Sequence, residues 1–156
     1  MEYDPSIIGV AMLVPLVQPT SRYAPAPIVD LTDKDVRARM TNGALKAFFN
    51  IMDVWQIRDA DARVLLGDVS NGSYYALKKG TDKPLDVDRL HRIAALIGIF
   101  KSLNILHDEA LADVWITRPN SNRIIGGLTP LAFLKSGGLP AFETLRRLLD
   151  ARRGGR

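Results

Sequence analysis

The chain has 156 residues, of which 47% are hydrophobic and 24% are charged, enough apolar material for one ordinary core or for two small subdomains that share a core. It contains no cysteine, so a disulfide framework, a thiolate metal site and a cysteine nucleophile are excluded. Residues 146–156 hold five arginines and one aspartate, so this basic tail carries the whole formal charge of +4 and the other 145 residues are neutral. The pI near 9.6 therefore reports a basic tail on a neutral body.

Residues 1–31 are expected to form an extended, proline-rich arm. The apolar stretch Ile7–Val17 is broken by Pro15, so it cannot form a membrane-spanning helix. Glu2 and Asp4 precede it, where a secretory signal peptide would carry Lys or Arg. The arm is interpreted either as a disordered leader or as a segment laid on a neighbouring subunit.

Residues 32–84 are predicted to hold a helix-turn-helix region. Apolar residues at helical spacing indicate a helix over 44–56, with a possible break before it at Asn42-Gly43. A short helix over 59–66 and a third over 71–79 follow, each ended by a glycine. This succession is typical of a helix-turn-helix, either functional or kept only for assembly. The candidate DNA contacts are Ser70, Asn71, Ser73, Tyr74, Lys78 and Lys79.

Residues 85–107 are predicted to form a long central helix that begins after Asp86, a good N-cap. The run Ile93–Phe100 is apolar on every side, so every side of it must be covered. Two solutions are open, burial between the flanking helices of one chain and a homodimer interface, and we expect both together. The predicted interface residues are Ile93, Leu96, Ile97 and Phe100.

Residues 108–156 are predicted to form a C-terminal helical hairpin with sharply specified turns. Asp108 caps a short helix, Pro119–Asn122 forms a turn, and Gly126-Gly127 interrupts regular structure. Thr129-Pro130 supplies an N-cap followed by proline at the first helical position, and Gly137-Gly138 ends that short helix before the last one. The structural motif of the hairpin is Trp115, Pro119, Gly126, Gly127, Pro130 and Leu134.

No catalytic or metal-binding pattern is found. His91 lies between arginines on a helix and His107 lies at a helix end, both ordinary structural positions. The pairs Asp59/Asp61 and Asp86/Asp88 lie about 200° apart around a helix and so do not share a face. No phosphate-binding glycine motif is present. We therefore expect a protein that is not an enzyme and that needs neither a cofactor nor a metal.

Several motifs in order resemble one known family. The order Trp115, Pro119-Asn120, Gly126-Gly127 and Pro130-Leu131, followed by a helix that ends in basic residues, is similar to the toxin-binding domain of the MbcA/ParS/Xre antitoxins. The upstream segments Leu65–Ser70, Leu85–Ile93 and Leu96–Leu103 fit the same family, so the resemblance covers roughly residues 43–153. It implies an all-α fold: a helix-turn-helix-like N-terminal part, a long central helix, and a toxin-binding hairpin at 108–156.

The resemblance also implies a function and a bacterial, cytoplasmic setting. Such a protein binds and neutralises a cognate RES-type toxin, which degrades NAD or transfers ADP-ribose, by covering the toxin's active site, and the complex represses its own operon. The alternatives are an Xre-type DNA-binding regulator without a toxin and a purely structural dimeric adaptor. Expected partners are thus the toxin, a second copy of the chain and operator DNA, but no membrane. The candidate toxin-contacting residues are Arg146, Arg147, Arg152, Arg153, Arg156, Asn120 and Arg123.

Overall fold

The computed structural model describes residues 29–154, and within that range every regular element is a helix. The predicted all-α class is confirmed. Most of the N-terminal arm, residues 1–28, and Arg156 lie outside the described residues. The helices are α2 (Lys34–Val54), α3 (Asp59–Leu65), α4 (Asn71–Lys79), α5 (Val87–Leu106), α6 (Glu109–Trp115) and α7 (Pro130–Gly154).

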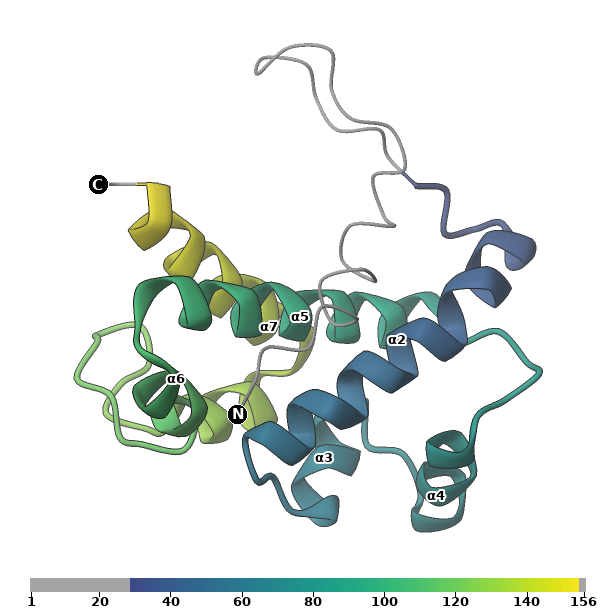
Figure 1. Cartoon of the computed structure of the whole chain (residues 1–156), viewed down its shortest axis with the longest axis horizontal. Helices are drawn as coiled ribbons and strands as arrows, with labels where there is room; N and C mark the ends of the chain where they lie inside the picture. Colours follow the sequence, from purple (N-terminus) through teal and green to yellow (C-terminus); the bar gives the residue numbers. More distant parts are fainter. Residues whose placement is uncertain (1–28, 155–156) are drawn as a thin grey trace, which may run out of the picture.

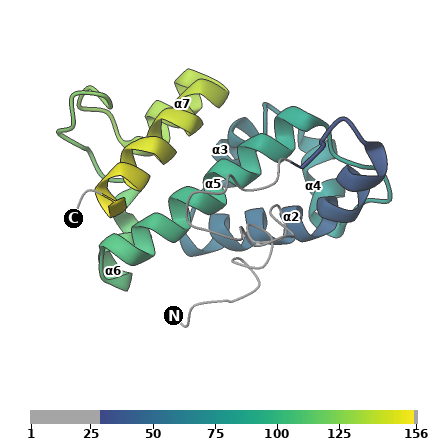
Figure 2. The ribbon, with the colours of Figure 1, turned by 90° about the horizontal axis from the view of Figure 1, so that it is seen from above.

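Helix α5 lies at the centre of the molecule, with α2 packed on one side and α7 on the other (Figures 1 and 2). The core between them is built from large side chains that are fully buried, such as Phe48 of α2, Leu96 and Leu103 of α5, and Phe142 of α7. Helix α4 packs against α2 and α3 packs against α7, both at the lower edge of Figure 1, and α6 follows the end of α5. No described helix is both long enough and apolar enough to cross a bilayer.

Side-chain caps set most of the helix starts, because a free carboxylate or hydroxyl can accept from a first-turn N–H that has no helical partner. The predicted starts of α4, α5 and α6 are confirmed by such bonds. The capping pairs are Asp33 with the N–H of Asp35, Ser70 with Ser73, Asp86 with Arg89, and Asp108 with Leu111.

The predicted break at Asn42-Gly43 is wrong, because α2 runs without interruption from Lys34 to Val54. A single helical glycine costs only about 1 kcal/mol, and the packing of this helix offsets it. The side chain of Asn42 serves a tertiary contact instead: its amide donates to the Thr81 carbonyl oxygen at 3.1 Å and accepts from the Thr81 N–H at 3.1 Å.

The predicted subunit interface on α5 is also wrong for the residues that defined it. Ile93, Leu96, Ile97 and Phe100 are all at most 4% exposed within one chain. Helices α2 and α7 cover opposite sides of α5, so one small domain does cover a helix that is apolar all round. These side chains are therefore not available to a second subunit.

The last helix is bent where the sequence predicted a stop. Gly138 has φ 62° and ψ −155° inside α7, a conformation that only glycine adopts without strain. Pro140 lies in the first turn after this bend, where its missing N–H costs nothing. The predicted cap at the start of α7 is present as well, since Thr129 Oγ1 accepts from the Ala132 N–H at 3.0 Å.

Candidate functional site

The loop of residues 117–129 between α6 and α7 is closed by its own hydrogen bonds. The Asn120 N–H donates to the Leu128 carbonyl at 3.1 Å, and Asn120 Oδ1 accepts from the Asn122 N–H at 2.9 Å. Asn122 Oδ1 in turn accepts from the Ile124 N–H at 2.9 Å. The side-chain oxygen of Asn120, a residue predicted to contact the toxin, thus stabilises the turn.

The hairpin motif residues divide into support and surface. Trp115, Pro130 and Leu134 are buried, and Ile125 reaches down from the loop to 1% exposure. Pro119, Gly126 and Gly127 are exposed, and the two glycines have φ of 68° and 81°. The loop is therefore a rigid platform on buried anchors, with its outer residues presented to solvent.

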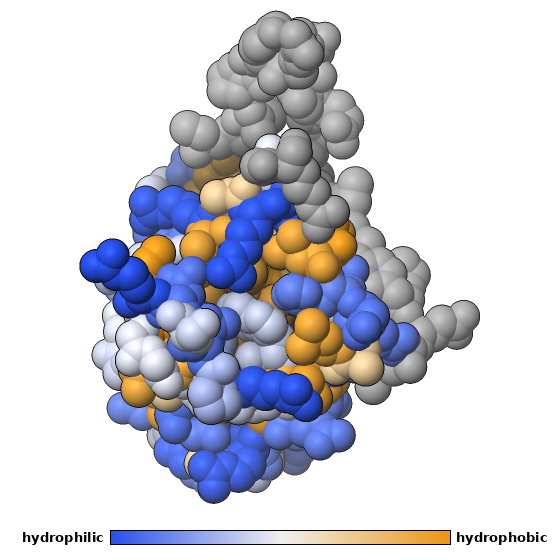
Figure 3. Space-filling model, turned by 90° about the vertical axis from the view of Figure 1, so that its left-hand side faces the viewer, coloured by the Kyte–Doolittle hydropathy of each residue, from blue (hydrophilic) through white to orange (hydrophobic). Residues whose placement is uncertain are grey.

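That platform carries apolar side chains on its outside. Ile124 is 50% and Leu128 46% exposed on the loop, and Ile105 (51%) and Leu111 (38%) are exposed at the end of α5 and on α6. Figure 3 shows this end of the molecule, where apolar groups reach the surface between charged ones. Tyr75 is the one other large apolar residue among the described residues that is exposed in this way. The apolar surface therefore concentrates in the C-terminal third.

The arginines of α7 fall into two groups. Arg146 and Arg153 each lie 3.7 Å from a carboxylate oxygen of Asp150. Arg152 is exposed and forms no ion pair or hydrogen bond within the described residues, and Arg147 is 77% exposed beside Glu143. The exposed Arg123 of the loop is likewise free among residues 29–154. Arg123, Arg147 and Arg152 are thus available to a partner, whereas Arg146 and Arg153 are partly engaged.

The helix-turn-helix region presents α4 at the edge of the molecule (Figure 1). Ser70, Asn71, Ser73 and Lys79 are exposed and can reach phosphates or base edges. Tyr74 cannot, and its assignment as a DNA contact is corrected here. It is 1% exposed and makes an edge-on ring contact with Phe49.

Asp59, at the start of α3, holds α4 in place and was not singled out as a site residue by the sequence. It accepts hydrogen bonds from the hydroxyls of Tyr74 and Tyr75, both at 2.8 Å. These bonds lower the pKa of Asp59, while burial first and then the bond to Asp59 raise the pKa of Tyr74. Lys78 lies 3.9 Å from the same carboxylate and 5.8 Å from the Phe49 ring centre, so it is partly engaged.

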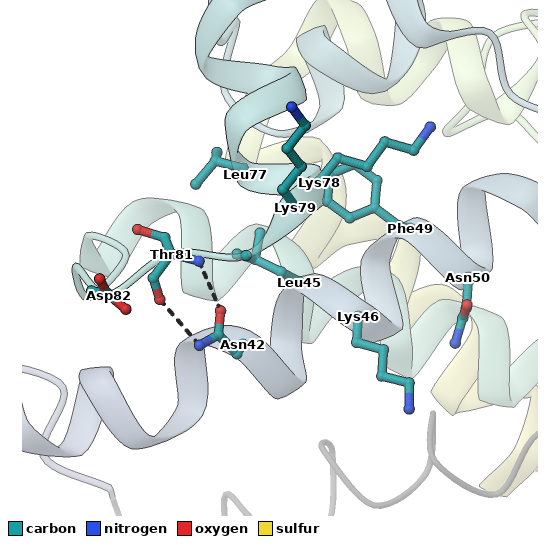
Figure 4. A pocket seen from close by; sticks show the side chains of 11 residues that line it. Asn42, Leu45, Lys46, Phe49, Asn50, Leu77, Lys78, Lys79, Thr81 and Asp82 are labelled. Carbon is teal, nitrogen blue, oxygen red and sulfur yellow. Dashed lines mark hydrogen bonds between the residues drawn. The ribbon is translucent and has the colours of Figure 1, made fainter.

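A groove of about 720 Å³ separates α2 from the end of α4 (Figure 4). Leu45, Phe49 and Leu77 line it together with lysines of both helices. Lys46 points away from Lys78 and Lys79 in this view, so the cations do not converge on one point and no small-anion site is built. Within residues 29–154, no three histidine or acidic side chains are grouped so that they could hold a metal ion.

Comparisons with known proteins find a family match for the C-terminal part of the chain. Residues 99–155 match the family described as the antitoxin Xre/MbcA/ParS C-terminal toxin-binding domain. The chain is also similar to y4oB of Sinorhizobium fredii (strain NBRC 101917 / NGR234), itself described as uncharacterized, with 35% identity over 112 residues that make up 71% of this chain and 84% of that protein. No solved structure gives a significant match. The chain therefore belongs to the same family as y4oB, and its residues 99–155 match the Xre/MbcA/ParS toxin-binding domain of antitoxins.

Proposed function

We propose that this protein is an antitoxin that neutralises a cognate RES-type toxin by covering the toxin's active site with the 117–129 loop and the second half of α7. The observation that carries the proposal is the exposed apolar surface of Ile105, Leu111, Ile124 and Leu128 in the toxin-binding domain. Large apolar side chains held on a rigid platform are the usual anchors of a protein interface. The match of residues 99–155 to an antitoxin toxin-binding domain supports an inhibitory role without catalysis.

The exposed arginines of α7 supply the second part of the proposal. RES-type toxins act on NAD, whose pyrophosphate is negatively charged. Their substrate pocket therefore has to accommodate cationic or hydrogen-bond-donating groups, and it also holds the catalytic acid. Arg147 and Arg152 are exposed on α7 and can enter such a pocket or pair with its acid. Apolar anchors then provide most of the affinity, while an arginine provides the block.

The test is co-expression with a RES-type toxin, taken from a reading frame adjacent to this gene, followed by pull-down and by NAD turnover in the purified complex. Replacing Ile124 and Leu128 together by Ser should weaken the complex by about tenfold or more, because two interface anchors are lost. Tyr75→Ser is the matched control: it removes an exposed apolar residue outside the domain, at 43% exposure, and should leave toxin binding unchanged. Equal binding by the double variant and the wild type would contradict the proposed surface.

Operator binding through α4 is a second candidate function, with autorepression as its outcome. It is supported by the exposed polar face of α4, with Asn71, Ser73 and Lys79 free of side-chain partners within the described residues. The alternatives, a regulator without a toxin and a purely structural adaptor, do not account for a toxin-binding domain. A homodimer, if formed, would need a surface other than the buried α5 residues.

A further inference from the structure

A groove of about 570 Å³ runs along the seam of α5 and α7, beside Gly98. A Cβ atom added at Gly98 would lie 2.6 Å from Arg146 Nε, so glycine at this position makes room for the guanidinium. Arg146 Nη1 also reaches the Ala94 carbonyl at 3.4 Å. The groove is lined by Gly98, Lys101, Ile105, Arg146, Asp150 and Arg153, with Gly154 at its end.

The side chains that line the groove carry a net positive charge. Three cations, Lys101, Arg146 and Arg153, face one carboxylate, Asp150. Lys101 forms no ion pair or hydrogen bond through its side chain within the described residues. Its ammonium group is therefore open to a partner.

The single carboxylate leaves the arginines with unused donors. Asp150 accepts a hydrogen bond from Ser102 at 3.0 Å, whereas both guanidinium groups stay 3.7 Å from its oxygens. That separation exceeds a hydrogen bond, and each guanidinium has five N–H donors in a planar fork suited to carboxylates. Arg153 donates one N–H to Ser102 Oγ at 3.3 Å, and its other donors remain available.

We propose that this groove binds an acidic side chain, Asp or Glu, presented by the toxin; the proposal rests on the proposed function and names a second contact surface for it. The groove already accommodates one carboxylate, and its excess charge favours another. Ile105, 51% exposed at the rim, lets an apolar neighbour of that acid pack beside it. A rim that joins apolar and cationic groups suits a protein partner better than a nucleic-acid backbone, whose binding relies on rows of phosphate contacts.

Two variants, Lys101→Glu and Gly98→Ala, test the groove without disturbing the core, and Lys83→Glu is the control. Lys101→Glu reverses a charge that has no described partner, and Lys83→Glu, exposed and also without a described side-chain partner, makes the same change outside the domain. Toxin affinity should fall about tenfold or more for Lys101→Glu, and by roughly threefold at most for Lys83→Glu. Gly98→Ala displaces only the flexible end of Arg146, so its toxin affinity should fall while its melting temperature is kept or raised, since alanine favours a helix.

The outcomes separate this proposal from the proposed function. If the wild type fails to bind the toxin at all, the proposed function fails; if it binds and Lys101→Glu and Gly98→Ala bind equally well, the groove proposal alone fails. Selection of toxin variants that restore growth with Lys101→Glu should yield Asp or Glu replaced by Lys or Arg. Saturable binding of inorganic phosphate to the free antitoxin that Lys101→Glu abolishes, or loss of DNA binding instead of toxin binding in that variant, would overturn it.

Discussion

The ammonium group of Lys135 in α7 donates a hydrogen bond to the carboxylate of Asp61 in α3, 74 residues earlier in the chain. Asp61 is 8% exposed and also accepts from Arg58 at 3.3 Å. This contact joins the helix-turn-helix region to the toxin-binding domain. The hydrogen bond from Lys135 is the main reason that the pKa of Asp61 lies below its ordinary value of 3.8.

Asp61→Asn should lower the free energy of unfolding by about 1.5–3 kcal/mol at pH 7, the range for a hydrogen bond to a charged group. Because the folded-state pKa is lowered, this stabilisation is full above the unfolded pKa and is lost as pH falls through the folded pKa. Urea denaturation at pH 7, 5 and 3 should therefore show the same difference between wild type and variant at pH 7 and 5, and a smaller difference at pH 3, which lies below the ordinary pKa of 3.8.

The control for this prediction is Asp82→Asn, which removes an exposed carboxylate without a described partner. It should change stability by roughly 0.5 kcal/mol or less, as expected for a surface substitution. If the free energy of unfolding of the wild type exceeds that of Asp61→Asn by the same amount at pH 3 and at pH 7, the ion pair is not the cause of the difference.

Trp115→Ala should cost roughly 3–5 kcal/mol of stability, because it removes a large buried side chain under the loop. Trp115 is 8% exposed, and the Ile116 carbonyl next to it accepts from the Leu131 N–H at 2.8 Å, fixing the entry to α7. Thermal unfolding measures the loss, with the half-exposed Ile124→Ala as comparison. Native-like stability of Trp115→Ala would mean that the indole does not hold the hairpin.

Local signals made much of the fold predictable. Asp86, Asp108 and Thr129 cap helices through bonds to residues three positions on, and Gly138 bends the chain through its own φ. Such contacts depend on neighbours in sequence, which a pattern can indicate.

Long-range contacts were not predictable, since no local pattern contains them. Thr41 Oγ1 accepts from the Leu85 N–H and helps to place α2 on the start of α5, and Tyr74 turns inward to Asp59. Four of the candidate arginines, Arg146, Arg147, Arg152 and Arg153, lie on α7. Which of them are engaged depends on Asp150 and on the space above Gly98, and the sequence pattern contains neither contact.

Lys79→Ala should weaken binding to the antitoxin's own promoter DNA and reduce the salt dependence of binding by about one phosphate contact. Lys79 is exposed on α4 without a described partner, whereas Lys78 is engaged with Asp59. Lys78→Ala should therefore have the smaller effect on the salt slope. Mobility-shift titrations over a series of salt concentrations measure both, and toxin neutralisation should stay intact. If Lys79→Ala lost toxin neutralisation while its DNA binding stayed unchanged, the assignment of Lys79 to DNA binding would be wrong.

Arg152→Ala should separate inhibition from binding. An exposed arginine contributes little affinity until it is enclosed, and the apolar anchors of the loop remain in this variant, as does Arg153 in the α5–α7 groove. Pull-down should therefore show a complex, while NAD turnover by the toxin returns. Arg152→Lys should restore the block only in part, because a point charge cannot reproduce the bidentate geometry of a guanidinium.

Arg39→Ala, on the exposed side of α2, is the matched control and should inhibit as the wild type does. The readout is NAD turnover by a fixed amount of toxin titrated with each antitoxin, beside the affinity of each complex. If Arg152→Ala inhibits fully at the same occupancy, the guanidinium does not enter the substrate pocket. The hairpin itself must then cover the toxin's active site. In that case the serine variants of Ile124 and Leu128 should lower inhibition only as far as they lower binding, because the same surface would both bind and inhibit the toxin.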